Sequence, residues 1–284
     1  GVPEIKIDSQ NAKEKIGLSD KKILMTFGLL TRNKGIETVI RAMPAIVKKH
    51  PEAVYLCLGK THPNVTRVSG EEYREFLEGL VEDLDVKDAV IFKNKFLSDE
   101  DIEIYLSASD FLVTPYQHEE QISSGPLTFA MGSGTAILST PFWYAEEMLT
   151  EGKGLLFDFK DHHELTDQVT KLLDDPSKLR KYKTTSHDFG KEITWEKIAG
   201  EYLSLAKTIV QGAKEDEGPE SKGKEYKIPN IDLTHLRRMT NETGIISNAK
   251  FAFPDYASGY LLMDNAMAML AVAINQDEIQ SETN

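Results

Sequence analysis

Short apolar runs alternate with longer stretches of helical period along most of the chain. The runs lack a helical period, which is typical of strands that are buried on both faces of a sheet. In the stretches between them, apolar residues recur every three or four positions, as in helices that pack one face on a core. The runs that we predict to be strands are 23–27, 53–58, 89–92, 111–113, 136–139 and 154–157.

This alternation predicts an α/β fold over residues 1–211, with a doubly wound, parallel, six-stranded Rossmann-like sheet in the strand order 3-2-1-4-5-6. Pro63 is expected to keep the loop 60–64 out of a helix. Ser98, with Asp101 three residues later, is the expected cap of another helix. The expected helices are 10–16, 36–50, 70–84, one that follows Ser98, 123–132, a helical block from Asp161 with breaks near Pro176 and Gly190, and 195–211.

The composition changes at Gly212, where charged residues, Gly, Pro and Ser replace the apolar pattern. This change predicts a linker at 212–229 and a separate helical segment at 230–284. Two helices are a thin basis for a core. We therefore expect the segment to begin a larger helical domain that is cut off, or to pack on the α/β domain or on a second copy, which would make a homo-oligomer. Its expected helices are 232–240 and 261–274.

Charge and composition narrow the class of protein. The net charge of −13 argues against nonspecific binding of DNA or RNA. No apolar run approaches the roughly 20 residues of a membrane helix, and no charged-then-apolar leader opens the chain, so we expect a cytoplasmic protein. The single cysteine, Cys57, excludes disulfides and a cysteine-based zinc site. No histidine pair has metal-ligand spacing, and we expect no metal.

The stretch 121–134 is the expected ligand site. It lies between two predicted strands, and ligands of such sheets bind beyond the carboxyl ends of the strands. Ser123, Ser124 and Gly125 lie where a helix should begin. Free backbone N–H groups and the positive end of the helix dipole suit a phosphate there. An ordinary helix start without a ligand would give the same pattern, so the motif alone leaves both interpretations open.

Basic residues follow three of the predicted strands. Arg32 and Lys34 lie in the loop after the first strand, ahead of a helix N-terminus, which is a good seat for a diphosphate. A solvated surface pair is the alternative. Lys60 follows the second strand and Lys95 the third, so both lie at the same edge of the sheet. Four cations at one edge of an acidic protein indicate an anionic ligand.

Several motifs resemble the donor half of retaining family-4, or group 1, glycosyltransferases. The resemblance covers roughly residues 21–205, and its motifs are 26–37, 59–63, 116–134 and 139–147. Such enzymes have two facing Rossmann-like domains in the GT-B arrangement, and the C-terminal one binds the nucleotide sugar without a metal or other cofactor. The resemblance implies that this chain holds that C-terminal domain, and that the N-terminal domain through which the carbohydrate acceptor would bind is missing.

The resemblance also implies roles for single residues. It places the donor diphosphate on Arg32 and Lys34, and sugar and phosphate on the loop 121–125. Most of the family has an arginine where Leu29 stands, and two glutamates separated by seven residues where this chain has Gln121 and Phe129. No catalytic residue is assigned, because the acceptor domain usually contributes the base. The implied donor-binding residues are Gly28, Arg32, Lys34, Lys60, Lys95, Gln121, Ser123, Ser124, Gly125 and Thr128.

The C-terminal segment carries a second resemblance. The stretches 232–240 and 259–266 are similar to the start of an α/α-toroid domain, which follows some of these transferases. Asp264 and Asn265 stand at matching polar positions, whereas methionines replace the expected Asp and Arg on either side.

Three functional hypotheses follow. The first is the donor domain of a retaining hexosyltransferase, which would bind a nucleotide diphosphate but turn over nothing as a fragment. The second is a non-catalytic module that only scaffolds a carbohydrate assembly, in line with the changes at Gln121 and Phe129. The third is an accessory domain to a toroid glycosidase or phosphorylase, which would need two suitably spaced acids that the visible tail does not supply.

Overall fold

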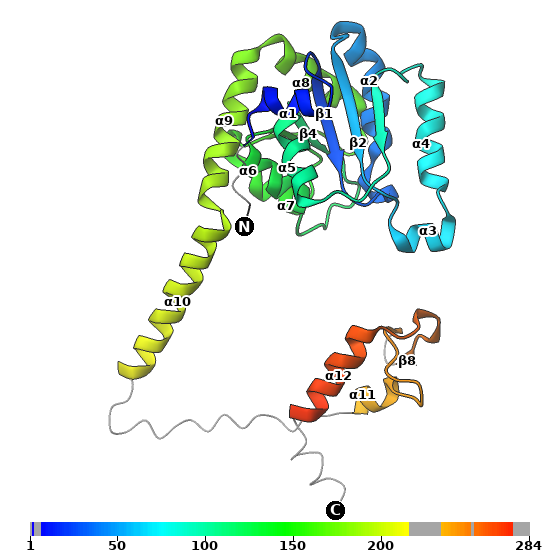
Figure 1. The fold of residues 1–284 in the computed structure, drawn as a ribbon, viewed down its shortest axis with the longest axis vertical. Coiled ribbons are helices and arrows are strands. Elements are labelled where there is room, and N and C mark those ends of the chain that lie inside the picture. The colour runs from blue at the N-terminus through cyan, green and yellow to red at the C-terminus, as the bar shows by residue number, and fades with distance from the viewer. Residues whose placement is uncertain (1, 3–6, 216–233, 251–252, 275–284) are drawn as a thin grey trace, which may run out of the picture. The chain divides into compact units, whose positions relative to one another are not determined.

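The structure, a computed structural model, describes residues 2, 7–215, 234–250 and 253–274 (Figure 1). The chain divides into two compact units, Gly1–Lys214 and Glu215–Asn284. No helix of the described part has the length and apolar character that crossing a membrane requires.

A six-stranded parallel sheet forms the centre of the first unit. Its strand order is β3-β2-β1-β4-β5-β6, which confirms the predicted order. In the register of the sheet, Leu24 of the first strand pairs with Tyr55 on one side and with Phe111 on the other. The direction of winding reverses between the first and fourth strands. The strands are β1 (Lys22–Phe27), β2 (Ala53–Leu58), β3 (Val90–Lys93), β4 (Phe111–Thr114), β5 (Ala136–Ser139) and β6 (Leu155–Leu156).

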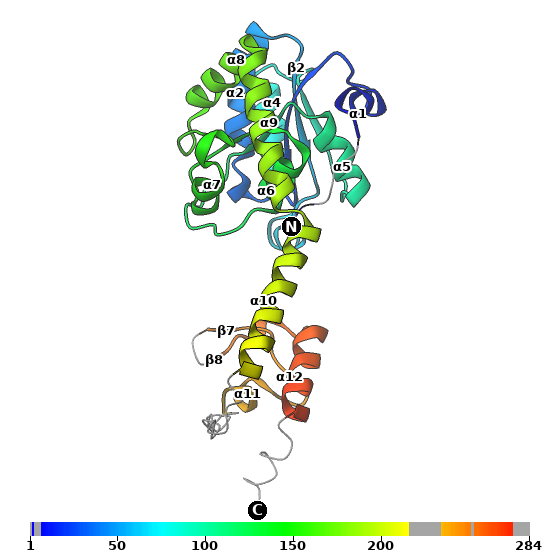
Figure 2. The same ribbon diagram turned by 90° about the vertical axis from the view of Figure 1, so that its left-hand side faces the viewer.

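Helices cover both faces of the sheet (Figure 2). Two hydrophobic cores lie between the layers. Alternate residues of a strand point to opposite faces, so Leu24 belongs to one core while Ile23 and Met25 belong to the other. On one face lie α2 (Ile36–Lys49), α4 (Glu72–Asp83) and α8 (His162–Asp174). On the other lie α1 (Ser9–Lys15), α5 (Asp99–Ala108), α6 (Gly125–Ser133) and α7 (Trp143–Met148). The remaining elements are η1 (Arg32–Lys34), α3 (Pro63–Ser69), η2 (Thr150–Gly152), α9 (Pro176–Glu192) and α10 (Trp195–Glu215).

Pro63, Gly190 and Gly212 do not act on the helices as predicted, and helix α7 was not predicted. Pro63 begins helix α3 instead of preventing it, because proline is tolerated in the first turn and His62 caps the helix. Gly190 does not break α9; it lies against α6, where a Cβ atom would meet the Met131 carbonyl oxygen at 2.5 Å. Helix α10 continues through Gly212 to Glu215, since one glycine costs a helix only about 1 kcal/mol. The rest of the predicted linker, 216–229, lies outside the described residues.

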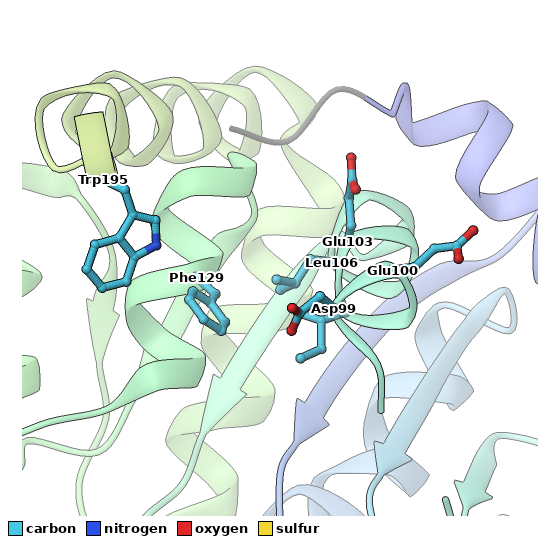
Figure 3. A pocket seen from close by; sticks show the side chains of 7 residues that line it. Asp99, Glu100, Glu103, Leu106, Phe129 and Trp195 are labelled. Carbon is cyan, nitrogen blue, oxygen red and sulfur yellow. The ribbon is translucent and has the colours of Figure 1, made fainter. Parts of the chain in front are cut away.

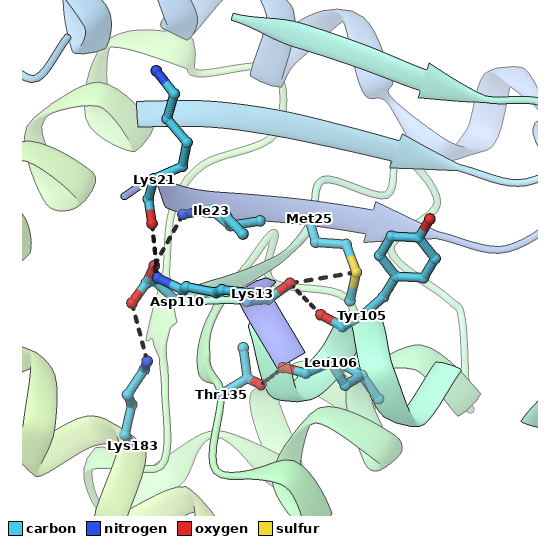
Figure 4. Close-up of polar contacts among 10 residues, drawn as sticks. Lys13, Lys21, Ile23, Met25, Tyr105, Leu106, Asp110, Thr135 and Lys183 are labelled. Carbon is cyan, nitrogen blue, oxygen red and sulfur yellow. Dashed lines mark hydrogen bonds and ion pairs between the residues drawn. The ribbon is translucent and has the colours of Figure 1, made fainter. Parts of the chain in front are cut away.

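Asp110, just before β4, ties several elements together at the amino edge of the sheet (Figure 4). Its carboxylate accepts hydrogen bonds from Lys13 of α1 at 2.7 Å, from the Ile23 N–H at 3.0 Å and from Lys183 of α9 at 3.3 Å. Burial alone would raise the pKa of Asp110, but the ammonium groups of Lys183 and Lys13 outweigh it and hold the pKa below its usual value. This cluster joins α1, β1 and α9 at the edge of the sheet opposite the candidate site.

The second unit is small. Asn265 joins its helix α12 to the preceding segment, because its side chain accepts the Ile245 N–H at 3.0 Å and donates to the Leu261 carbonyl at 2.9 Å. Helices α11 and α12 lie where the sequence predicted helices, although residues 232–233 fall outside the described part. Leu262 and Met263 of α12 are exposed. The elements are α11 (Thr234–Met239), β7 (Ala249–Lys250), β8 (Phe253–Pro254), η3 (Tyr256–Ser258) and α12 (Leu262–Ile274).

Candidate functional site

The loops after β1 and β4 meet at the carboxyl edge of the sheet. Because winding reverses between these two strands, this is the switch point where open α/β sheets bind ligands. The loop after β1 contains η1 and leads into α2, and the loop after β4 leads into α6. Most of the residues expected to bind a donor come from these two loops, so the fold brings them to one place.

Lys34 has its ammonium group at the switch point. Nζ donates to the Tyr116 hydroxyl at 2.8 Å and lies 4.1 Å from the centroid of that ring. Tyr116 is buried and stacks on Phe142, with 5.2 Å between ring centroids. On the other side is Gly28, where a Cβ atom would be only 3.6 Å from Nζ. A half-buried cation therefore lies between the ends of β1 and β4, against a stacked aromatic pair.

Arg32 takes a different direction. Its guanidinium pairs with Glu72 of α4 at 2.5 Å, and its Cζ lies 5.4 Å from the Tyr73 ring centroid and 5.9 Å from that of Phe76. Both charged side chains are more than 60% exposed, so water screens the pair. Arg32 thus faces α4, and its role in binding a diphosphate stays a prediction.

The other two predicted cations lie on neighbouring loops. Lys60 follows β2 and is exposed, while its carbonyl accepts the Leu30 N–H at 2.8 Å. Lys95 follows β3 and donates to Asp101 at 2.6 Å, and this hydrogen bond raises the pKa of Lys95. All four predicted cations therefore follow β1, β2 or β3 at the carboxyl edge, but Arg32 and Lys95 already have carboxylate partners.

Helix α6 begins close to where the sequence predicted a helix start, and Ser124 is its N-cap. Ser124 is buried; its Oγ accepts the Leu127 N–H at 3.3 Å, and its carbonyl accepts the Thr128 hydroxyl at 2.8 Å. Pro126 in this turn has no N–H. Among the described residues this leaves the N–H of Gly125 as the donor at the helix start, and a Cβ atom on Gly125 would meet nothing within 4 Å. The Thr128 hydroxyl is also 2.7 Å from that of Tyr144.

Gln121 and Ser123 form a small turn ahead of this helix. The Gln121 side-chain nitrogen donates to the Ser123 carbonyl at 2.8 Å, and its oxygen accepts from Asn33 of η1 at 3.2 Å. Gln121 is half-buried, and Ser123 is exposed. The amide therefore links the two loops of the site directly.

Two residues of this edge could not be identified from the sequence. Asn33 is an ordinary polar residue between two cations in the loop after β1. Arg74 lies in an acid-rich helix, yet it is buried and donates to the Gly59 carbonyl at 2.8 Å and to Asn94 at 3.3 Å. Its Nη1 has no hydrogen-bond partner among the described residues. Neither position carries a local signal, because both act through contacts that are distant in sequence.

The first unit also has a cavity away from the switch point. A cavity of about 320 Å³ opens between α5, α6 and α10 (Figure 3). Its lining residues are Asp99, Glu100, Ile102, Glu103, Leu106, Phe129 and Trp195. At the switch point itself, the space beside Gly28 and Lys34 is too narrow to admit water. The switch point gathers the groups that suit an anion, whereas carboxylates line the cavity between α5, α6 and α10. A ligand of the switch point would lie on the open loops.

The described residues contain no group of three or more His, Cys, Asp or Glu side chains that could hold a metal ion.

Known proteins resemble the chain in sequence and fold. The family model of glycosyl transferases group 1 matches residues 8–188. Spore coat protein SA of Bacillus subtilis is 25% identical over 209 residues, which are 70% of this chain and 53% of that protein. Sucrose-phosphate synthase from Thermosynechococcus elongatus aligns with a TM-score of 0.62 at 25% identity, over 73% of this chain and 50% of the synthase.

A third relative was solved with a ligand. Anabaena HepE in complex with UDP-glucose aligns with a TM-score of 0.60 over 72% of this chain and 52% of HepE. At 16% identity this likeness shows the fold alone. The chain spans about half the length of each of these three proteins.

Proposed function

Because the chain belongs to the glycosyl transferases of group 1 and carries one Rossmann-like half of their GT-B fold, we propose that it is the donor-binding half of a retaining hexosyltransferase. The whole enzyme would transfer a hexose from a nucleotide diphosphate to a carbohydrate or related acceptor. The observation that carries this proposal is the Lys34 ammonium, held at the β1–β4 switch point beside the loop that leads to the start of α6.

The diphosphate would lie on the open loops of the switch point. Lys34 would supply a fixed positive charge, and the Gly125 N–H a hydrogen bond at the positive end of α6. Arg32 would reach the same anion after leaving Glu72. As the bond to the sugar breaks, negative charge grows on the departing nucleotide, and these groups would stabilise that charge without a metal ion. The sugar would lie against Gln121.

The other half of the reaction would belong to a domain outside this sequence. The acceptor would bind to an N-terminal domain, and that domain would complete the active site. This chain alone would therefore bind donor and turn over nothing. We also propose that the enzyme works in the cytoplasm and that the segment 230–284 begins an α/α-toroid domain. The exposed apolar residues of α12 would pack on its further helices or on a second copy.

Calorimetry with UDP, GDP and ADP tests the proposal. We expect at least one nucleotide to bind, and Lys34→Ala to weaken its binding at least tenfold, about the worth of a charge-assisted hydrogen bond. Arg32→Ala should weaken it less. Lys87→Ala is the control, because Lys87 precedes β3 at the opposite edge and pairs with Glu82. No binding at millimolar concentration, or unchanged affinity in both Arg32→Ala and Lys34→Ala, would overturn the diphosphate site.

A further inference from the structure

We propose that Asn33 is a positioning residue, which fixes the orientation of the Gln121 amide and so determines what the site presents to the donor sugar. The inference rests on the proposed function, since it names a second residue of the same site. Asn33 lies in η1 between two cations, and its partners lie more than 80 residues further along the chain.

The orientation of Asn33 is set by the backbone. Its Oδ1 accepts the His118 N–H at 2.9 Å and the Gln117 N–H at 3.2 Å, and its own carbonyl also accepts the Gln117 N–H at 2.9 Å. A peptide N–H can only donate, so the atom that faces these two groups must be the oxygen of the Asn33 amide. The nitrogen of Asn33 then has to point the other way.

That nitrogen determines the orientation of Gln121. Asn33 Nδ2 donates to Gln121 Oε1 at 3.2 Å, which leaves Gln121 Nε2 at the far end, where it donates to the Ser123 carbonyl at 2.8 Å. A carbonyl can only accept, so the Ser123 end demands the same orientation independently. The two ends therefore agree, and turning the Gln121 amide over would place two donors together at one end and two acceptors together at the other.

This arrangement requires an amide at position 121. A carboxylate there could accept from Asn33 but would set a negative oxygen against the Ser123 carbonyl. Ser123 directly precedes Ser124, the cap of α6, so the repulsion would act on the helix start itself. The glutamine is thus matched to its surroundings on both sides.

The loops around the amide are braced. Gln117 Nε2 donates to Glu37 of α2 at 2.9 Å, and Glu37 also accepts from the Tyr73 hydroxyl at 2.5 Å. Burial and this hydrogen bond to Glu37 raise the pKa of Tyr73, so its hydroxyl keeps its proton. Gln117, whose N–H donates to Asn33, is therefore also tied to α2 through Glu37.

The Gln121 side chain still has hydrogen-bonding groups that a ligand could use. One N–H of Nε2 and one lone pair of Oε1 are left, so the side chain can serve a sugar hydroxyl group both as donor and as acceptor. Asn33 decides which end of the amide carries which role. The bare nucleotide has no sugar in this place, and so Asn33 should affect nucleotide sugars but not nucleotides.

Asn33→Asp tests the inference with the smallest change. The new carboxylate still accepts from the two backbone N–H groups but cannot donate to Gln121. The added negative charge acts alike on UDP and UDP-glucose through their shared diphosphate, so the ratio of the two affinities is the readout. We expect the affinity for UDP-glucose to fall about fivefold more than the affinity for UDP, the worth of one hydrogen bond. Asn11→Asp, the same exchange on α1, is the control and should change neither. An unchanged ratio of the two affinities in Asn33→Asp would overturn the inference.

A double-mutant cycle shows whether Asn33 acts through Gln121. In a Gln121→Ala background, Asn33→Asp should leave the ratio of UDP-glucose to UDP affinity unchanged. A further fivefold loss in that background would overturn the positioning role, because Asn33 would then act on the sugar by another route.

A measurement without ligand separates this inference from the proposed function. In the ¹H–¹⁵N correlation spectrum, the side-chain NH₂ of Gln121 should give two distinct proton signals that exchange slowly with solvent. Asn33→Asp should change their chemical shifts and speed their exchange. If UDP does not bind the wild-type chain but this change occurs, the donor site fails while the Asn33–Gln121 relationship stands. If the Gln121 signals do not respond to Asn33→Asp, the inference is overturned whatever the nucleotide does.

Discussion

A Cβ atom on Gly35 would lie 2.0 Å from the carbonyl oxygen of Pro115. Gly35 joins η1 to α2 with a φ of +59°, and Pro115 follows β4 directly, so this contact brings together the loops that leave two neighbouring strands. Only a residue without a side chain allows the approach. The hydrogen bonds between Asn33 and the residues after Pro115 depend on it, and with them the geometry of the whole site.

We predict that Gly35→Ala lowers the free energy of unfolding by at least about 2 kcal/mol, because the methyl group forces the loops apart and the backbone conformation is strained. Urea denaturation measures the change. Gly79→Ala is the matched control: Gly79 is exposed in α4, a Cβ there meets nothing within 4 Å, and alanine should raise helix stability by up to about 1 kcal/mol. Equal unfolding curves for Gly35→Ala and wild type would show that the loops are not in contact.

Asp110 should make folding sensitive to acid. The pKa of Asp110 is lowered in the folded state. Its contribution to the free energy of unfolding is therefore complete above the usual aspartate pKa, and it is lost as pH falls through the lower pKa of the folded state. At neutral pH, Asp110→Asn leaves the buried Lys13 and the partly buried Lys183 without their counter-ion and should destabilise the protein by about 3 kcal/mol.

Urea denaturation of wild type and Asp110→Asn at pH 7 and near pH 3 checks this. The difference in the free energy of unfolding between the two proteins should shrink as the wild-type carboxyl becomes protonated. Asp174→Asn, at an exposed ion pair with Lys49, should have a small effect at either pH. If that difference in the free energy of unfolding is the same at both pH values, Asp110 does not stabilise the fold through its negative charge.

Cys57 should be inert in the folded protein. Burial raises the pKa of its thiol to about 12, against a smaller opposite effect of Arg74, so almost no thiolate exists at pH 8. We predict that an aromatic disulfide reagent labels the folded chain only at the rate of unfolding, and labels it at once in urea. Rapid labelling of the native protein would mean that β2 is open to solvent at Cys57.

The pair between Arg32 and Glu72 should oppose nucleotide binding if Arg32 serves the diphosphate. Glu72→Gln removes the competing charge and is expected to strengthen UDP binding up to about fivefold, since exposed ion pairs are weak. The gain should vanish in the Arg32→Ala background. An equal gain in both backgrounds would mean that Glu72 repels the nucleotide by itself and that Arg32 takes no part.

The sheet and its order could be predicted because each strand is a continuous apolar run and each helix an amphipathic stretch. The position of Lys34 at the switch point followed from the same pattern, since it lies in the loop after β1. Partners could not be predicted in this way. Glu72 lies 40 residues from Arg32 on a helix whose many acids look alike, and the packing of α4 decides which one reaches the guanidinium.

The same limit explains why the role of Asn33 could not be predicted from the sequence. In the sequence it is a polar residue between two cations, and only tertiary structure places it against Gln117, 84 residues away. Pro63 and Gly190 show the other source of error. Both residues disfavour helix locally, yet a cap at His62 and a close approach to Met131 make them suitable where they stand.

A crystal structure of this chain with UDP tests the central claim most directly. We predict that oxygens of the diphosphate lie within hydrogen-bonding distance of Lys34 Nζ and of the Gly125 N–H, at the carboxyl ends of β1 and β4. A nucleotide bound instead in the cavity beneath Trp195, with Lys34 still on Tyr116 and no phosphate near it, would contradict the account.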